Sequence, residues 1–390
     1  MVYSNTRAFL RFVSRNFIGN RGTNYRLTAK RLGVLLLATI IYVPVEIFVW
    51  TGFFLDEIFF PKFHNFKVEQ PVFIIGNPRS GTTFLQRLMA RDKGNFLSMR
   101  TWEIFVSPSI ITRKAFRGIV RVCRAIGLRI SKRIRKMEEL WKDDDRIHRF
   151  RLRAPEEDEY LFIHNFSTLK IWSYASMENE AEPYIYYDQM ISQKDKDRNM
   201  AYYTSCIQRH FYYHGQVKKK YLSKNPNFSP AIDTLLESFP DAKFIYLVRD
   251  PREAVPSHIS LKEREWQLLG APLKDYACAD FIIRSSEHWY NYPLKRLEDL
   301  PLDQAIIVKF DDLVKDTENT LVRIYRQLGF SMTNEFISLL KKETVKARNH
   351  HSQHIYSLSE MGISREELTD RFRPIIERFG FGADNQDGII

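Results

Sequence analysis

The sequence is poor in cysteine and lacks the spacings that mark bound zinc or a disulfide framework. Three cysteines occur in 390 residues, at Cys123, Cys206 and Cys278, and no Cys-x-x-Cys pair is present. A structural zinc site is therefore not expected. The sparse, odd count also argues against a disulfide-built extracellular scaffold and favours a reducing compartment.

Acidic residues are missing from two stretches of the chain. Residues 1–31 hold seven Arg and Lys, and residues 111–136 hold ten, with no Asp or Glu in either stretch. The formal net charge of +12 therefore comes from two local patches, and the rest of the chain is net acidic. Such patches suit anionic lipid or nucleic acid. Because neither patch carries a recognition motif, we expect no nucleic-acid partner.

A long apolar run at 32–60 follows the first basic stretch. About 20 apolar residues can span a bilayer, but Pro44 and Glu46 interrupt this run, and an acid inside a membrane is costly. The sequence favours two shorter helices, broken at Pro44, that lie in the membrane interface. A true span, and a core or dimerising helix pair, are the alternatives. Residues 1–66 are thus expected to form a basic, membrane-associating part, separate from the body at 67–390.

A phosphate-binding loop without the Walker lysine is the most informative motif. Residues 71–75 are apolar, as in a buried parallel strand, and lead into Gly76-Asn-Pro-Arg-Ser-Gly81 and a predicted helix. Backbone N–H groups at such a helix start suit a phosphate-like group. The nucleoside-triphosphatase pattern requires Lys after the second glycine, and Thr82 stands there instead. The positive side chain is Arg79, inside the loop.

Strands and helices alternate through the second half of the chain. Strands are predicted at 219–223, 243–248 and 305–310, and helices lie between and after them. This alternation predicts an α/β fold, with a P-loop-like parallel sheet flanked by helices and extra N-terminal membrane-associating helices. A further amphipathic helix is predicted at 113–136, inside a helical and aromatic insertion at about 110–215.

A second anion-binding segment follows the strand at 243–248. Arg249 stands where that strand ends, and Ser257 lies about two helical turns further on. Ligands of parallel sheets bind beyond the carboxyl ends of the strands, so Arg249 is expected at the same edge as the loop. A guanidinium and a hydroxyl together suit a phosphate. An Arg-Asp-Pro turn that merely caps a helix is an equally good interpretation of this segment alone.

Together, these segments resemble the sulfotransferase superfamily, and in particular its large microbial branch. The resemblance rests on Pro78-Arg-Ser-Gly-Thr-Thr83, Leu222-Ser-Lys-Asn-Pro226, Phe239-Pro-Asp-Ala-Lys-Phe244, Arg249-Asp-Pro251 and His354-Ile-Tyr-Ser-Leu358. These motifs follow the family's order and cover about 71–375. Residues 1–70 fall outside the resemblance.

The resemblance implies transfer of a sulfuryl group from 3′-phosphoadenosine 5′-phosphosulfate, without a metal. It assigns donor binding to residues of the loop, the second segment and the C-terminal motif: Arg79, Ser80, Gly81, Thr82, Thr83, Arg249, Ser257, Tyr356 and Ser357. The cytosolic branch of the family usually has Lys where this chain has Arg79. Because arginine cannot give up a proton at neutral pH, Arg79 is expected to act electrostatically.

The identity of the general base stays open between several residues. Glu103 is placed as in the branches of the family that use Glu. The acidic cluster at 156–159 resembles a motif of the microbial branch and offers Glu157 or Glu159, although acids also suit an ordinary helix start. His258 is the histidine nearest to the site in sequence. We expect Glu103 or Glu157 to remove the proton of the acceptor.

The acceptor is expected to be lipophilic. Thirteen aromatic residues lie between positions 160 and 213, and this density, with the apolar run at 32–60, suits a sterol, lipid alcohol or glycolipid. The same aromatics could instead form the core. We expect an enzyme at the inner membrane surface, on the cytoplasmic side, with a homodimer as one option. A P-loop kinase and a non-catalytic membrane adaptor remain as alternatives.

Overall fold

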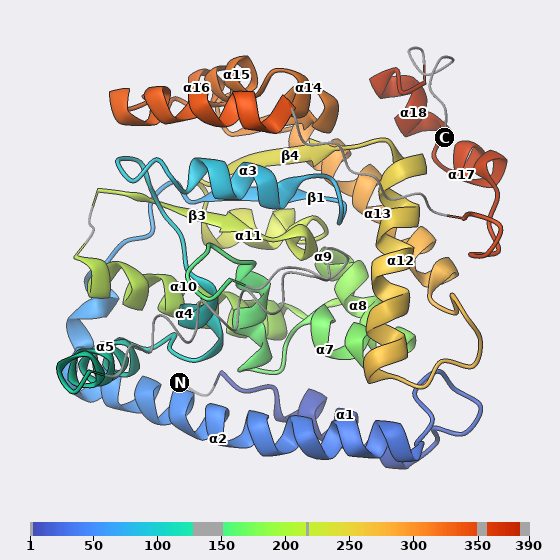
Figure 1. Cartoon of the computed structure of the whole chain (residues 1–390), viewed down its shortest axis with the longest axis horizontal. Helices are drawn as coiled ribbons and strands as arrows, with labels where there is room; N and C mark the ends of the chain where they lie inside the picture. Colours follow the sequence, from blue (N-terminus) through green and yellow to red (C-terminus); the bar gives the residue numbers. More distant parts are fainter. Residues whose placement is uncertain (1–2, 128–150, 216–217, 349–356, 383–390) are drawn as a thin grey trace.

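A parallel five-stranded sheet forms the centre of the molecule (Figure 1). The computed structural model describes residues 3–127, 151–215, 218–348 and 357–382. The strands are β1 (Val72–Gly76), β2 (Phe96–Leu97), β3 (Lys220–Lys224), β4 (Lys243–Val248) and β5 (Ala305–Lys309), in the order β2-β3-β1-β4-β5. Every neighbouring pair is parallel. The predicted α/β sheet is therefore confirmed, and the loop after β1 and the turn after β4 lie at the same edge.

Alternate residues of the central strands belong to two separate hydrophobic cores. Val72 and Ile74 pack with α3 (Thr82–Met89), α15 (Thr317–Gln327) and α16 (Asn334–Arg348) on one face. Phe73 and Ile75 pack on the other face with α11 (Ile232–Ser238), α12 (Pro251–Leu269) and α13 (Ala279–Glu298). Because side chains of a strand alternate between its two faces, a strand covered on both sides is apolar throughout.

The predicted insertion is helical and lies below the sheet in the view of Figure 1. The elements of the insertion are α5 (Ile110–Ala125), η2 (Asp158–Ile163), α7 (Leu169–Tyr174), α8 (Glu178–Ile185), α9 (Tyr187–Met190) and α10 (Gln193–His214). It is preceded by the short helix α4 (Thr101–Phe105). The predicted helix at 113–136 is present as α5, and its last residues, 128–136, lie outside the described residues. The remaining helices are α14 (Phe310–Lys315), α17 (Arg365–Arg371) and α18 (Arg373–Phe379).

The N-terminal apolar run forms one helix, so the prediction of two helices broken at Pro44 is wrong. After α1 (Thr6–Phe17), helix α2 extends over Ala29–Phe59 with Pro44 inside it. Tyr42 donates to the Ile163 carbonyl at 3.0 Å, and Glu46 Oε1 lies 2.7 Å from His164 Nδ1. These contacts hold the helix against one loop on both sides of Pro44, which offsets a cost of about 3 kcal/mol for an internal proline.

Asp56, near the end of α2, joins this helix to the body of the protein. Its carboxylate accepts hydrogen bonds from the backbone N–H groups of Ile110 and Ile111, at 2.8 and 2.9 Å, and thereby caps α5. Arg209 of α10 donates to the same carboxylate at 3.0 Å, and both side chains are buried. Helix α2 is thus fixed to the body along its length. A domain boundary at residue 66 stays a prediction.

Replacing Asp56 should destabilise the fold strongly. In Asp56→Ala the Arg209 guanidinium loses its buried partner, and two backbone N–H groups at the start of α5 lose their acceptor, so we expect a loss of about 3–5 kcal/mol in the free energy of unfolding. Glu57→Ala is the matched control, because Glu57 also pairs with Arg209, at 2.7 Å, but is 44% exposed. A loss below about 1 kcal/mol is expected there. Equal losses in denaturant titrations of the two variants would contradict this account.

Candidate functional site

Two glycines shape the loop between β1 and α3. Gly76 has φ +146°, and a Cβ atom there would lie 2.4 Å from the Leu247 carbonyl oxygen of the neighbouring strand. Gly81 has φ +86° and is the N-cap of α3, where a Cβ atom would lie 2.5 Å from the ring of Phe310. Both positions therefore require glycine. The loop that results presents Arg79, Gly81, Thr82 and Thr83 to a large cavity.

The structure brings the two predicted anion-binding segments together. Arg249, at the end of β4, donates from Nη1 to the backbone carbonyl of Arg79 at 3.1 Å. Arg79 in turn donates from Nε to the hydroxyl of Ser257 at 2.9 Å. Arg79 itself has φ +72°, an uncommon conformation for a residue with a side chain. Arg79 from the loop after β1 and two residues from the segment after β4, Arg249 and Ser257, therefore form one contiguous group at the sheet edge.

Two of the predicted donor-binding residues, Ser80 in the loop and Ser257 beside it, do not line the cavity. Ser80 is fully buried, and Ser257 is buried and reaches the site through Arg79. Ser357 lies elsewhere, with its hydroxyl 3.1 Å from that of Ser359. Tyr356 lies outside the described residues. The assignment of the C-terminal motif to donor binding stays a prediction.

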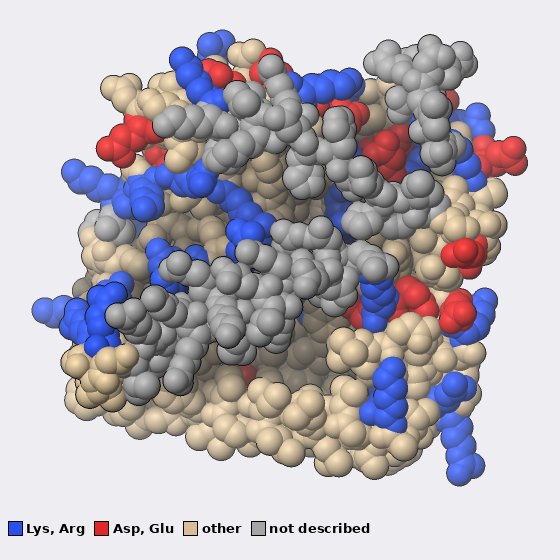
Figure 2. Space-filling view, viewed as in Figure 1, with Lys and Arg blue, Asp and Glu red and all other residues tan. Residues whose placement is uncertain are grey.

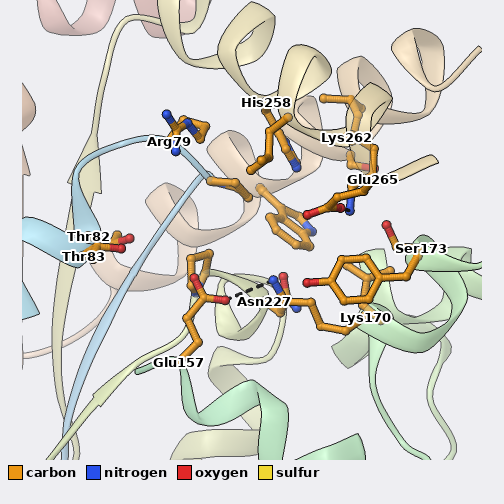
Figure 3. Close-up of a pocket in the computed structure, with 18 of the residues that line it drawn as sticks. Arg79, Thr82, Thr83, Glu157, Lys170, Ser173, Asn227, His258, Lys262 and Glu265 are labelled. Carbon is orange, nitrogen blue, oxygen red and sulfur yellow. Dashed lines mark hydrogen bonds and ion pairs between the residues drawn. The ribbon is translucent and has the colours of Figure 1, made fainter. Parts of the chain in front are cut away.

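The cavity beside the loop has a volume of about 1010 Å³ and is lined by both charged and apolar side chains. Arg79 and Arg249 line it beside the loop, and further charged residues line it elsewhere: Glu157, Lys170, Lys262, Arg264 and Glu265. Apolar side chains line much of the remainder: Phe105, Ile163, Leu169, Leu261, Phe281 and Trp289. Figure 3 shows Arg79 at one side of the cavity and Lys170, Ser173 and Glu265 across from it.

Glu157 is the predicted base that lies in the cavity. Its Oε1 accepts from Lys224 Nζ at 2.8 Å, and its Oε2 lies 3.0 Å from Lys170 Nζ. Lys224 is the last residue of β3, and Lys170 belongs to α7. Two lysines from distant elements therefore hold one carboxylate. Figure 3 shows Glu157 and Lys170 facing each other. Lys170 also lies 5.1 Å from the centre of the Tyr160 ring, which favours its charged form.

Glu103 lies in a different, buried cluster, so its placement does not support a role as the general base. Its Oε2 accepts from the backbone N–H of Arg100 at 2.8 Å, and its Oε1 lies 3.4 Å from His214 Nε2. Burial alone would raise the pKa of Glu103, but the His214 hydrogen bond and the Arg113 charge hold that pKa well below its usual range. A carboxylate so stabilised, and outside the cavity, is a structural anion.

The cluster around Glu103 also contains histidines, but its arrangement disfavours a metal ion. Ligand atoms of Glu103, His210 and His214 lie within 4.8 Å of one another. Arg113, however, lies among them, with Nη1 2.7 Å from His210 Nδ1. Because a guanidinium can only donate, His210 Nδ1 accepts and its Nε2 carries the proton, which leaves no lone pair for a metal. Burial and the Arg113 charge lower the pKa of His210 well below its ordinary value.

Glu159, the other candidate in the acidic cluster, lies beneath the cavity wall and not in the cavity. Its carboxylate accepts from Asn225 Nδ2 at 3.1 Å and contacts the hydroxyl of Thr168. Burial raises the pKa of Glu159 to about 7 despite these hydrogen bonds. Burial likewise raises the pKa of Asp158 to about 6, against hydrogen bonds from Tyr203, Ser223 and Tyr221.

Sequence reasoning missed Lys170 and overestimated the aromatic lining. Lys170 lies in a segment without a motif, so no local signal marks it. Of the thirteen aromatics between 160 and 213, Tyr160 and Tyr174 line the cavity, while Trp172, Tyr202 and others are buried in the core. His258, the histidine nearest to the loop motifs in sequence, also lines the cavity. Burial lowers the pKa of His258 well below its ordinary value, so its imidazole is neutral at pH 7.

Comparisons with known proteins agree on one family. The model of the sulfotransferase family matches residues 71–334. The omega-hydroxy-beta-dihydromenaquinone-9 sulfotransferase Stf3 of Mycobacterium bovis is 23% identical over 317 residues, which are 80% of this chain and 76% of that protein. The same protein from Mycobacterium tuberculosis matches equally.

Two solved structures share the fold over almost their whole length. Sulfotransferase STF9 from Mycobacterium avium superposes with a TM-score of 0.72 at 19% identity, covering 97% of both chains. Sulfotransferase STF1 from M. tuberculosis H37Rv gives a TM-score of 0.68 at 15% identity, covering 96% of this chain and 93% of that one. The likeness therefore includes the N-terminal helices as well as the sheet.

Glu159 should contribute more to stability in mild acid than at neutral pH, whereas the buried histidines His210 and His258 act in the opposite direction. Because the pKa of Glu159 is raised on folding, its stabilising effect is complete below about pH 4.5 and is lost as the pH rises through about 7. Glu159→Gln should remove this part of the pH dependence, up to about 3 kcal/mol. The Thr168 hydroxyl can turn to accept from the new amide. Denaturant unfolding at pH 5 and pH 8 tests this: an unchanged difference between the two pH values in the variant would contradict it.

Proposed function

This chain belongs to the sulfotransferase family, and we propose that it transfers a sulfuryl group from 3′-phosphoadenosine 5′-phosphosulfate to a hydroxyl group of a lipophilic acceptor. The observation that carries the proposal is that the Arg79 loop and a set of apolar side chains line one and the same cavity. The name of the Mycobacterium relative gives an omega-hydroxylated dihydromenaquinone as its acceptor, which supports a lipid alcohol here.

The side of the cavity beside the loop fits a donor with two anionic groups. Thr82 and Thr83 open α3 beside the loop, and the positive end of this helix favours negative charge. Arg79 and Arg249 add two guanidinium groups, and Ser257 adds a hydroxyl within 2.9 Å of Arg79. We assign the loop to the phosphosulfate, and Arg249 with Ser257 to the 3′-phosphate. When bound, the donor supplies an activated sulfuryl group on a phosphate leaving group.

Glu157 is our choice for the general base. It accepts the proton of the acceptor hydroxyl as that oxygen forms its bond to sulfur and the bond from sulfur to the phosphate oxygen breaks. Lys224 and Lys170, 2.8 and 3.0 Å from its oxygens, fix the carboxylate in one orientation. Arg79 balances the negative charge that grows on the leaving phosphate, because guanidinium groups aimed at developing charge lower the barrier.

The neutral imidazole of His258 is the second base candidate inside the cavity. Its Nδ1 is buried without a hydrogen-bond partner among the described residues. A neutral imidazole could accept a proton, but its lowered pKa makes it a weaker base than an ordinary histidine. Glu157 is preferred because it already has cationic partners that hold it in one orientation.

Donor binding should be visible as a thermal shift. Adenosine 3′,5′-bisphosphate at about 100 times its Kd should raise the Tm of the wild type by roughly 2–4 °C, whereas ADP with Mg²⁺ should not. Arg249→Ala should lose most of that shift. Arg252→Ala is the control, because Arg252 lies one turn away, pairs with Asp250 at 2.6 Å and does not line the cavity. A shift by ADP that equals the shift by the bisphosphate would favour a kinase instead.

The two candidate bases can be separated by kinetics with any lipophilic alcohol that the wild type sulfates. Glu157→Gln should lower kcat about 10²–10⁴-fold while leaving the bisphosphate-induced thermal shift intact. His258→Asn should lower kcat less than about tenfold. If the histidine variant instead shows the large loss and the glutamine variant remains active, the proton goes to His258 and our assignment is wrong.

A further inference from the structure

We propose that α1, α2 and α5 form a docking face for an anionic lipid bilayer, with α2 lying parallel to the membrane surface. Helix α2 is long and apolar enough to cross a membrane by length and composition. However, the side of α2 that faces the body is hydrogen-bonded to the loop at 163–164, which favours a helix that lies along the membrane surface. Binding to the bilayer does not depend on the sulfuryl-transfer chemistry; the delivery of the acceptor described below does rest on the proposed function.

The outer side of α2 is a continuous apolar strip. Its most exposed large side chains are Leu37, Ile40, Ile41, Ile47, Phe54 and Phe59; Ile40 and Ile47 are 69% and 64% exposed. No exposed residue between 32 and 51 is charged. Contiguous apolar surfaces of this kind are rare on soluble monomers and mark an interaction site. In Figure 2 the lower edge, over α2, is almost free of charged side chains.

Two neighbouring helices widen the strip. On α1, Leu10 and Phe17 are exposed, and on α5 Val122 and Ile126 are exposed. Helix α5 packs closely on α2, because a Cβ atom at Gly52 would lie 2.4 Å from the Ser109 hydroxyl. All three helices therefore carry exposed apolar side chains.

Basic side chains accompany this face. Exposed Arg7 and Arg11 lie on α1, and exposed Arg117, Arg121 and Arg124 lie on α5. Figure 2 shows Lys and Arg gathered beside α5 and, in smaller number, near the opposite end of α2. Each basic residue near an anionic leaflet contributes about 1 kcal/mol to binding. A second copy of the chain would bring these like charges together, so charge complementarity favours anionic lipid as the occupant.

The inner side of α2 excludes a membrane-spanning position for this helix. Tyr42, Glu46 and Trp50 follow one another at four-residue spacing, and all three bond the loop at 163–164. A span would carry Glu46 into hydrocarbon, away from His164. Lying flat, the helix keeps these partners and immerses only its apolar side, as interfacial amphipathic helices do.

The docking face adjoins the wall of the cavity. Ile163, whose carbonyl accepts from Tyr42, lines the cavity. At the start of α2, Lys30 donates to the Gln267 carbonyl. Leu268, which follows Gln267 in sequence, lines the cavity and is 63% exposed. The cavity wall thus reaches the surface beside α2. A lipophilic alcohol leaving the bilayer would enter the cavity there without crossing water.

Flotation of the full chain with vesicles tests the docking face. The wild type should float with vesicles containing 30% phosphatidylglycerol in phosphatidylcholine, and about tenfold less with phosphatidylcholine alone. Ile40→Glu/Ile47→Glu should reduce binding to anionic vesicles at least about tenfold. Arg7→Glu/Arg11→Glu should weaken binding to anionic vesicles and leave the weak binding to neutral vesicles unchanged.

Leu302→Glu is the matched control, because Leu302 is 83% exposed but lies in the loop before β5, away from the three helices. It should bind vesicles as the wild type does. All variants should retain the bisphosphate-induced thermal shift, which reports a folded donor site. Wild-type protein that stays with the soluble fraction, or an Ile40/Ile47 variant that floats normally, would overturn the docking face. Loss of donor binding with intact flotation would instead overturn the proposed function.

Discussion

The parallel pairing of β1 with β4 is the constraint on which the site depends. Its register places Gly76 beside Leu247, and the backbones approach so closely that no side chain fits at position 76. Strands β1 and β4 therefore end at the same edge of the sheet, and a helix follows each of them there. Arg249 can then reach the Arg79 carbonyl, and Arg79 can reach Ser257. Backbone packing at a single glycine thus positions a group of charged side chains.

The carboxylate that we propose as the general base, by contrast, depends on packing between elements that are far apart in sequence. Glu157 is held by Lys224 from the sheet and Lys170 from the inserted helices. Its neighbours Asp158 and Glu159 turn into the core, where tyrosine, serine, asparagine and threonine side chains satisfy them. One short acidic segment therefore supplies a cavity group and two buried anchors, because successive residues point in different directions.

The sequence alone predicted secondary structure and residue positions correctly where a local rule applied. The strand, loop and helix at 71–89 and the position of Arg249 followed from hydrophobic runs, turn residues and the edge rule for parallel sheets. Glu103 and Glu157 could not be ranked, because only tertiary contacts show that the first meets Arg100 and His214 while the second meets two lysines. The break at Pro44 failed for the same reason: contacts from Tyr42 and Glu46 outweigh the local preference of proline.

Pro44 has one more effect, which concerns depth. Proline has no N–H group, so it cannot donate to the carbonyl of Ile40 one turn earlier, near the middle of the exposed strip. A carbonyl without a donor is costly in hydrocarbon but is easily hydrated among lipid headgroups. If α2 docks on a bilayer as proposed, this carbonyl would limit how deeply the helix can enter and would keep the nearby cavity wall at the level of the headgroups.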